Sequence, residues 1–240
     1  SHSIFFFKMA NSARNIPGKQ QESTIEEVNP LLSLQEKYEA KKKPINTALT
    51  IIVVVIVGYF AYDKLIAEPK ENKAMTAISH AQAYFAQDSA SKALNGDGAN
   101  KGFLSVIKTY SGTKAGNLAN YYAGLCYLQM KDAKNAIKYL KDFNAHGTDL
   151  EYMAYGALGD AYMDMGNTKE GIEGYMKAAG DKKDIAVTPL YLYRAAVAYE
   201  MDKQNDKAIE NFKRIRDEYP QSQQARETEK ELARLGFVGE

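Results

Sequence analysis

The sequence predicts an all-α protein in which helical pairs stack into a solenoid behind one apolar helix. Two observations predict this fold: a pattern that occurs three times at a nearly constant spacing, and an apolar run, residues 45–62, without a charged side chain. A chain of 240 residues, 45% hydrophobic, is long enough for one folded domain with an appendage. Its 31 basic and 30 acidic residues leave no net charge to attract nucleic acid, so we expect no nucleic-acid partner.

Three tyrosines, Tyr127, Tyr162 and Tyr199, mark the recurring pattern. A tiny residue lies three positions before each tyrosine, another lies nine positions after it, and a bulky residue follows four positions later. These three sets are Gly124, Gly159 and Ala196; Ala136, Gly171 and Ala208; and Leu140, Tyr175 and Phe212. Residues without bulk let two helices approach closely, so each copy predicts a helical hairpin. One hairpin cannot bury its apolar face alone, and the copies must stack.

This pattern resembles the tetratricopeptide repeat, which has a period of about 34 residues and the order Leu-Gly-x-x-Tyr, Ala, Phe, Pro. The likeness is clearest in residues 157–162 and 208–212, with Pro220 closing the third copy. The chain departs from the family pattern in having no Trp, and Thr148 and Lys183 stand where a proline would end a repeat. The resemblance implies an α-solenoid whose concave face binds other proteins or peptides.

In that family five positions of the first helix of each repeat line the concave groove. The resemblance therefore implies a partner-binding groove lined by Leu118, Tyr121, Leu125, Leu128, Met153, Asp160, Met163, Leu190, Tyr193, Val197 and Met201, with Gln129, Gly156, Asp164 and Glu200 at the remaining positions. The family's clamp for acidic peptides needs Lys, Arg and Asn there, and none is present. A mostly Leu, Met and Tyr surface fits a broad apolar partner. Alternatively, the helix predicted over 73–94, or the C-terminal helix, folds into this groove and covers it.

The region before the apolar run predicts a tail with one short helix. Residues 1–8 precede Met9 and are read as a non-native leader, and residues 9–43 form the tail. Its helix starts at Asn29 and Pro30 and is ended by residues 41–44, Lys-Lys-Lys-Pro. Its apolar face, which includes Leu31, lies on the membrane surface; the alternative is a docking peptide for a cytoplasmic partner.

The apolar run predicts a transmembrane anchor over residues 44–66, in contact with the lipid bilayer from Ile45 to Ile66. Eighteen residues at about 1.5 Å each nearly cross the ~30 Å of bilayer hydrocarbon. Tyr59, Phe60 and Tyr62 crowd one end as an aromatic belt does. A buried core helix is the alternative, but core helices of a repeat array are amphipathic and this one is apolar all round. No small-x-small cleavage site follows, so the anchor is read as uncleaved.

Lysines at the amino end of the anchor predict its orientation. Lys37 and residues 41–43 precede the span, whereas the lysines that follow it alternate with Asp63, Glu68 and Glu71. The excess of basic residues favours a cytoplasmic N-terminus. The repeats of a single-pass inner-membrane protein would then lie in the periplasm.

The remaining chain divides into residues 67–111, 112–148, 149–185, 186–221 and 222–240. The first holds a linker helix and a degenerate repeat, the next three hold one repeat each, and the last holds a capping helix and tail. The linker helix, 73–94, continues the anchor with a break near Pro69 and stops at residues 95–98. The degenerate repeat follows from a match at a constant offset along the chain, in which Ala99, Phe103, Val106, Tyr110 and Ser111 correspond to Ala208, Phe212, Ile215, Tyr219 and Pro220.

No pattern in the sequence indicates catalysis, a cofactor or a metal. Cys126 falls on a predicted buried helix and is expected to be a core thiol. His80 and His146 belong to different repeats, and Asp97, between two glycines, is not followed by further oxygen ligands. We therefore expect a binding protein and not an enzyme.

The whole architecture resembles the bacterial single-span inner-membrane tetratricopeptide proteins that act as ancillary subunits of the Sec translocon. This resemblance implies an adaptor that links the translocon or secreted clients to periplasmic chaperones. One alternative is a scaffold for assembly of the cell envelope or division machinery. Another is an organelle-surface receptor with cytosolic repeats, against which the missing clamp and the lysines before the span both count.

Overall fold

The structure, a computed structural model, describes residues 30–180 and 184–237, and it divides into two compact units between Val57 and Gly58. Every regular element in these residues is a helix, which confirms the all-α fold class. The elements are α1 (Pro30–Tyr62), η1 (Asp63–Ala67), α2 (Glu68–Ala86), α3 (Ala90–Asn95), α4 (Phe103–Thr109), α5 (Lys114–Gln129), α6 (Ala133–Asp142), α7 (Glu151–Asp164), α8 (Thr168–Ala179), α9 (Val187–Met201), α10 (Asn205–Glu218) and α11 (Gln223–Arg234). The predicted leader, the tail up to Asn29 and residues 238–240 lie outside the described residues.

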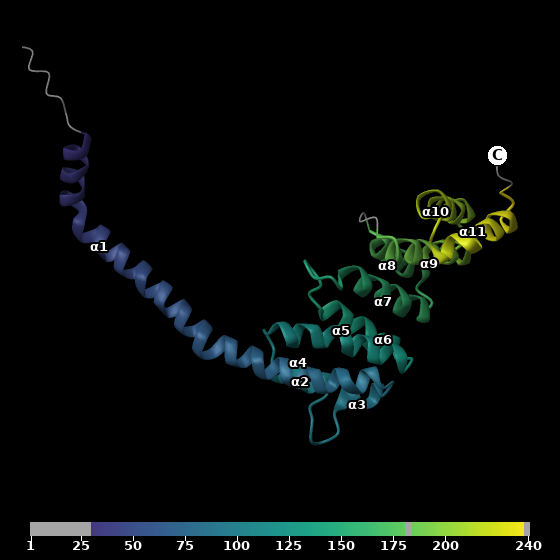
Figure 1. The fold of residues 1–240 in the computed structure, drawn as a ribbon, viewed down its shortest axis with the longest axis horizontal. Helices are drawn as coiled ribbons and strands as arrows, with labels where there is room; N and C mark the ends of the chain where they lie inside the picture. Colours follow the sequence, from purple (N-terminus) through teal and green to yellow (C-terminus); the bar gives the residue numbers. More distant parts are fainter. Residues whose placement is uncertain (1–29, 181–183, 238–240) are drawn as a thin grey trace, which may run out of the picture. The chain divides into compact units, whose positions relative to one another are not determined.

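The helices of the second unit form a tetratricopeptide-like array of successive pairs (Figure 1). α5 packs against α6, α7 against α8, and α9 against α10, and the second helix of each pair also packs against the first helix of the next. α11 follows as one further helix, in contact with α9 and α10. The first helices α5, α7 and α9 are the ones whose residues were predicted to line a groove.

The turn inside each pair has the same backbone form. The residue four positions after the marker tyrosine, Lys131, Gly166 or Lys203, has a positive φ of 61°, 76° or 58°. The next amide donates to the carbonyl of the tyrosine itself, at 2.8 to 2.9 Å. This left-handed residue ends the first helix and satisfies a carbonyl that would otherwise lack a partner.

The same turn identifies an opening repeat that begins with α2. Asp88 has a φ of 55°, and the Ser89 amide donates to the Tyr84 carbonyl at 3.0 Å. Ala81 and Ala93, three positions before and nine after Tyr84, are both 0% exposed. The prediction of one helix over 73–94 is therefore wrong: α2 ends at Ala86, because a short polar residue tolerates the left-handed conformation that the turn requires.

The second helix of the opening repeat is interrupted by a loop. The stretch from Tyr84 to Phe103 is longer than the equivalent stretch from Tyr199 to Phe212, so the opening repeat carries an insertion between α3 and α4. Ala99 was predicted to match a buried helical alanine, and this is wrong, since it is exposed in the loop. Gly96 explains the exit from the helix: its φ is 81°, and a Cβ on it would lie 2.3 Å from a backbone oxygen.

α1 is longer than predicted and continues through Pro44, so the prediction that residues 41–44 end a separate short helix is wrong. A proline inside a helix removes one hydrogen bond at a cost of roughly 3 kcal/mol, which the long helical stretches on both sides tolerate. The predicted break near Pro69 is also absent. A π-helical turn, η1, leads directly into α2, where Pro69 sits in the first turn and its missing N–H costs least.

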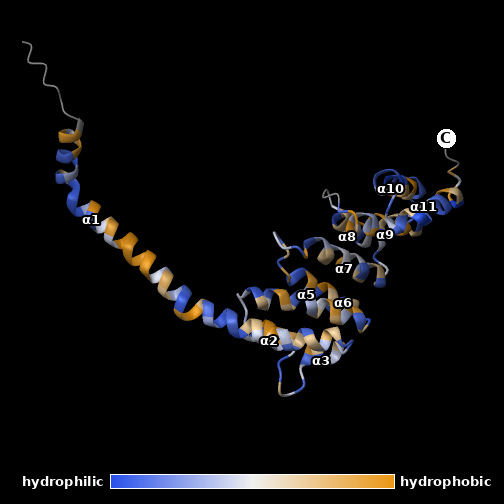
Figure 2. Ribbon diagram, in the orientation of Figure 1, coloured by the Kyte–Doolittle hydropathy of each residue, from blue (hydrophilic) through white to orange (hydrophobic). Residues whose placement is uncertain are grey.

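Among the described residues, one helix is long and apolar enough to cross a membrane, and none of its most apolar window is buried. Figure 2 shows this window as the orange part of α1. Val54 and Val55 are each 63% exposed. The alternative prediction of a buried core helix is therefore wrong.

Candidate functional site

The described residues gather four of the predicted groove positions in one depression between α7 and α9. Its lining includes Asp160 and Met163 from α7 and Tyr193 and Val197 from α9, together with Tyr175, Arg194 and Ala198, and its volume is about 310 Å³. Val197 is 39% exposed and Met163 and Tyr193 are half-buried, so apolar surface is open to solvent here. This depression is the candidate site.

Glycines on α7 allow large rings to lie directly on its backbone, and one of these rings, that of Tyr175, lines the depression. A Cβ on Gly156 would lie 2.2 Å from the ring of Tyr191, and one on Gly159 would lie 2.6 Å from the ring of Tyr175. Gly156 was predicted as a groove position, and the structure shows why it is small: the ring of the next repeat occupies its place. The two tyrosines stack with 6.3 Å between ring centroids.

An ion pair joins α7 to α9 at the floor of the depression. Arg194 Nη1 donates to both oxygens of Asp160, at 2.9 and 2.8 Å, and the Tyr175 hydroxyl donates to Oδ1 at 2.7 Å. The Arg194 guanidinium also lies over the Tyr191 ring, 5.5 Å from its centroid. Because Asp160 and Arg194 pair with one another, their charges cancel and the depression offers mainly its apolar side chains to a partner.

Burial is the main reason that the pKa of Tyr175 is raised, and its hydrogen bond to Asp160 raises that pKa further. The hydroxyl therefore keeps its proton and remains a donor to the carboxylate at physiological pH. Sequence reasoning missed both Tyr175 and Arg194 as site residues. The sequence does contain a signal for the ion pair, because Asp160 and Arg194 have opposite charges and are separated by one repeat length.

Of the predicted groove positions of the first repeat, one is buried, three are half-buried and one, Gln129, is exposed. Tyr121 is only 4% exposed and belongs to a buried cluster with Leu140 and Phe143. Three further predicted residues pack partly buried against that cluster: Leu118, Leu125 and Leu128. The first repeat thus has accessible groove positions too, but none of them lines the depression between α7 and α9.

Other predicted groove residues lie outside the depression. Met153, near the start of α7, is 45% exposed, and Met201, at the end of α9, is 64% exposed. Leu190 packs partly buried against the core cluster that contains Leu192. These methionines enlarge the apolar surface available along α7 and α9.

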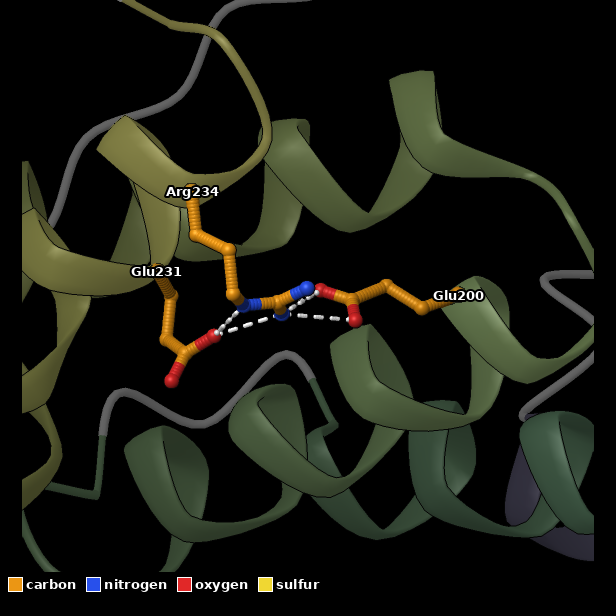
Figure 3. Close-up of polar contacts among 3 residues, drawn as sticks. All are labelled: Glu200, Glu231 and Arg234. Atoms are coloured by element: carbon orange, nitrogen blue, oxygen red, sulfur yellow. Dashed lines mark hydrogen bonds and ion pairs between the residues drawn. The ribbon is translucent and has the colours of Figure 1, made fainter.

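The capping helix contacts one predicted groove residue, Glu200. Figure 3 shows Arg234 of α11 between the carboxylates of Glu200 and Glu231. Its Nη2 lies 2.7 Å from each oxygen of Glu200 and 2.6 Å from Glu231 Oε2. α11 therefore engages the Glu200 end of α9, while Val197 and Met201 stay accessible. The alternative in which a helix covers the whole groove does not hold for this depression.

Cys126 is fully buried, and burial raises the pKa of its thiol to about 12. It is therefore a protonated core residue at physiological pH. Within residues 30–180 and 184–237, no three His, Cys, Asp or Glu side chains come together as a metal site would require.

Comparison with protein-family models matches residues 118–145 and 191–222 to the tetratricopeptide repeat. Curated protein sequences give no match. Solved structures with similar folds include nearly identical TPR-like repeats of a putative kinesin light chain from Podosopora anserina, with 14% identity and a TM-score of 0.53, covering 69% of this chain and 85% of that one. They also include MamA from residue 41 to its end, from Desulfovibrio magneticus RS-1, with 21% identity and a TM-score of 0.52, covering 68% and 84%. At these identities the likeness is one of fold.

Proposed function

Because the chain carries tetratricopeptide repeats that follow one long apolar helix, we propose that it is a membrane-anchored adaptor that binds other proteins through the depression between α7 and α9. One observation carries this proposal: the depression exposes Met163, Tyr193 and Val197 while its two charged groups, Asp160 and Arg194, are already paired.

The chemistry of the depression selects an apolar segment as its ligand. A partner carboxylate or cation would meet a charge that is already paired, because Arg194 Nη1 donates to both oxygens of Asp160, and either would therefore gain little here. An apolar side chain displaces only water from Val197 and Met163. Methionine adapts to different shapes, so several client sequences can bind.

The anchor and its orientation complete the proposal. The apolar part of α1 spans the inner membrane once, with residues 41–43, three exposed lysines, on the cytoplasmic side and the repeats in the periplasm. The resemblance to ancillary translocon subunits supports a role in which the repeats hold a periplasmic chaperone or an emerging client beside the Sec translocon.

Crosslinking from the depression in native membranes tests the partner. A photo-crosslinking amino acid at position 197 should capture a translocon subunit or a periplasmic folding factor. The matched control is the same amino acid at Lys138, an exposed residue of α6. Equal capture from both positions, or capture of neither class of protein from position 197, contradicts the proposal.

Protease treatment of spheroplasts tests the orientation separately. Protease added from outside should digest the repeats of the proposed topology and leave a small membrane fragment that contains α1. Protection of the repeats in intact spheroplasts, with digestion only after lysis, would place them in the cytoplasm and favour the receptor alternative.

A further inference from the structure

A second groove lies between α8 and α10 and shares no lining residue with the depression between α7 and α9. Its volume is about 810 Å³. Met176 of α8 is half-buried in its lining, beside the buried core residues Ile172 and Ala179. The groove therefore runs between the second helices of two neighbouring repeats and has both apolar and charged lining residues.

The charged side chains that line this groove are mostly basic. They are Lys169, Lys177, Lys207 and Arg214, against the single carboxylate of Glu173. Glu173 pairs with Lys177 at 2.7 Å, and Arg214 lies 3.5 Å from Glu218. Lys169 and Lys207 have no carboxylate within 4.0 Å among the described residues, so the groove keeps an unneutralised positive charge.

Aromatic rings position two of these lysines. The ammonium of Lys207 lies 5.5 Å from the centroid of the Tyr199 ring, and that of Lys177 lies 5.8 Å from the Tyr155 ring. A cation held over a ring loses less side-chain freedom when it binds an anion than a free surface lysine does. The tyrosines also line the groove and give a peptide a flat apolar wall.

The dimensions of the groove fit a short extended peptide. Lys169 and Gly180 both line it, so it follows α8 over roughly 16 Å at about 1.5 Å per residue. An extended chain at about 3.3 Å per residue crosses that length in roughly five residues. Alternate side chains of such a peptide point to opposite faces, so one set can meet the half-buried Met176 and Tyr155 while the other meets the lysines.

We propose that the groove between α8 and α10 is a docking site for an acidic peptide segment of about five residues with alternating apolar and carboxylate side chains. Its carboxylates pair with Lys169 and Lys207, the two lysines of the groove that have no carboxylate of their own within the described residues. The net charge of the whole chain, +1, provides no general attraction for nucleic acid and so favours a peptide.

Fluorescence anisotropy with the full-length protein in zwitterionic nanodiscs tests this site. The probe is a labelled peptide, Glu-Leu-Glu-Phe-Glu-Leu, and its partner peptide carries Gln in place of each Glu. The acidic peptide should bind in low salt and lose affinity as salt rises, because the contacts are charge-assisted. The Gln peptide should bind at least tenfold more weakly.

Charge reversal at two lysines locates the binding. Lys169→Glu with Lys207→Glu should weaken the acidic peptide at least tenfold. The control, Lys134→Glu with Lys230→Glu, makes the same change in net charge on exposed lysines of α6 and α11 and should keep affinity within about twofold. Equal losses in the two variants, or no binding of the acidic peptide at 1 mM, overturn the proposal.

Two further measurements keep the test independent of folding defects and of other anions. A photo-crosslinking amino acid at position 207 of the otherwise native protein should capture the acidic peptide, and one at position 134 should not. Binding of phosphatidylglycerol vesicles or of a single-stranded oligonucleotide at position 207, with no capture of the peptide, would assign the groove to a lipid or a nucleic acid and overturn the peptide proposal.

Discussion

The opening repeat and the third repeat bury equivalent side chains on different backbones. Phe103 and Val106 lie on α4, a helix of 7 residues, and Phe212 and Ile215 lie on α10, a helix of 14 residues, yet all four are 0% exposed. Two features therefore define a repeat: the fully buried residues of its second helix, and the left-handed turn after its marker tyrosine. The amino-terminal half of the second helix can be replaced by a short helix and a loop.

The two repeats also differ in how they hold the helix that follows them. The opening repeat places the Glu71 carboxylate on the first amides of α5, with 2.7 Å to Lys114 N and 2.9 Å to Ala115 N. The third repeat holds α11 partly through the ion pair between Glu200 and Arg234. A carboxylate on helix N-terminal amides satisfies donors that have no other partner, whereas an exposed ion pair replaces contacts with water.

The largest expected effect on stability comes from replacing the fully buried phenylalanine of each repeat. The two variants test whether the repeats contribute equally to stability. Phe103→Ala and Phe212→Ala should each lower the free energy of unfolding by about 3–5 kcal/mol, because both rings are fully buried. Denaturant unfolding of the full chain in detergent measures this. A cost below ~1 kcal/mol for Phe103→Ala alone would show that the opening repeat is not part of the cooperative array.

The sequence alone was enough to predict the features of the repeats that depend on the spacing of nearby residues. The tiny residues and tyrosines of the three clear repeats are recognisable because each acts within one hairpin, as Gly159 does under Tyr175. The opening repeat was predicted correctly at Phe103 and Val106 but wrongly at Ala99, because the glycines at 96 and 98 resemble the end of a first helix. In the structure the second helix has already begun at Ala93, and the backbone contact between Gly96 and Lys101 closes the inserted segment.

The candidate site was predictable in part for the same reason. Asp160, Met163, Tyr193 and Val197 follow from their positions on the first helices, and they meet in one depression. The basic groove was missed, because Lys169 and Lys207 lie far apart in the sequence, on second helices of different repeats. Both lysines line one groove because of how neighbouring helical pairs pack against each other. The sequence pattern within one hairpin carries no information about that packing.

A smaller effect is expected from the link between the opening repeat and α5. Glu71→Ala leaves two amides of α5 without their acceptor and should cost about 0.5–2 kcal/mol, the range seen when a helix loses its N-terminal cap. Glu68→Ala, which removes only an exposed pair with Lys64, is the matched control. Faster hydrogen exchange at residues 114 and 115 in the first variant, and not in the second, would identify the cause.

The ion pair between the third repeat and α11 should contribute less to the stability of the protein. Arg234→Ala removes the pairs to Glu200 and Glu231, but Arg234 is exposed, and such pairs are screened by salt. We expect a shift in the unfolding midpoint smaller than that of Glu71→Ala, and one that disappears in 0.5 M NaCl. A larger and salt-independent shift would mean that α11 depends on this arginine for more than the ion pair.

The smallest effect concerns the inserted loop of the opening repeat, which the third repeat lacks. Asp97 accepts from the Tyr84 hydroxyl, from Asn100 N at 2.7 Å and from Ala99 N at 3.0 Å. The bond from Tyr84, followed by the one from Asn100, lowers the pKa of Asp97 to about 2. Because this pKa is below the unfolded value of about 3.9, the carboxylate stabilises the loop above pH 4, and this contribution is lost as the pH falls toward 2.

Asp97→Ala should therefore speed hydrogen exchange of residues 95–102 at neutral pH, while α9 and α10 exchange as before. Exchange rates of the native protein, corrected for intrinsic rates, should approach those of the variant only below about pH 3. Asp88→Asn is the control within the same repeat, since asparagine also tolerates the positive φ at that turn. If Asp97→Ala leaves the hydrogen exchange of the loop unchanged, the backbone contact between Gly96 and Lys101 is enough to close the inserted loop. The Asp97 carboxylate would then not be needed for the opening repeat to use a short second helix.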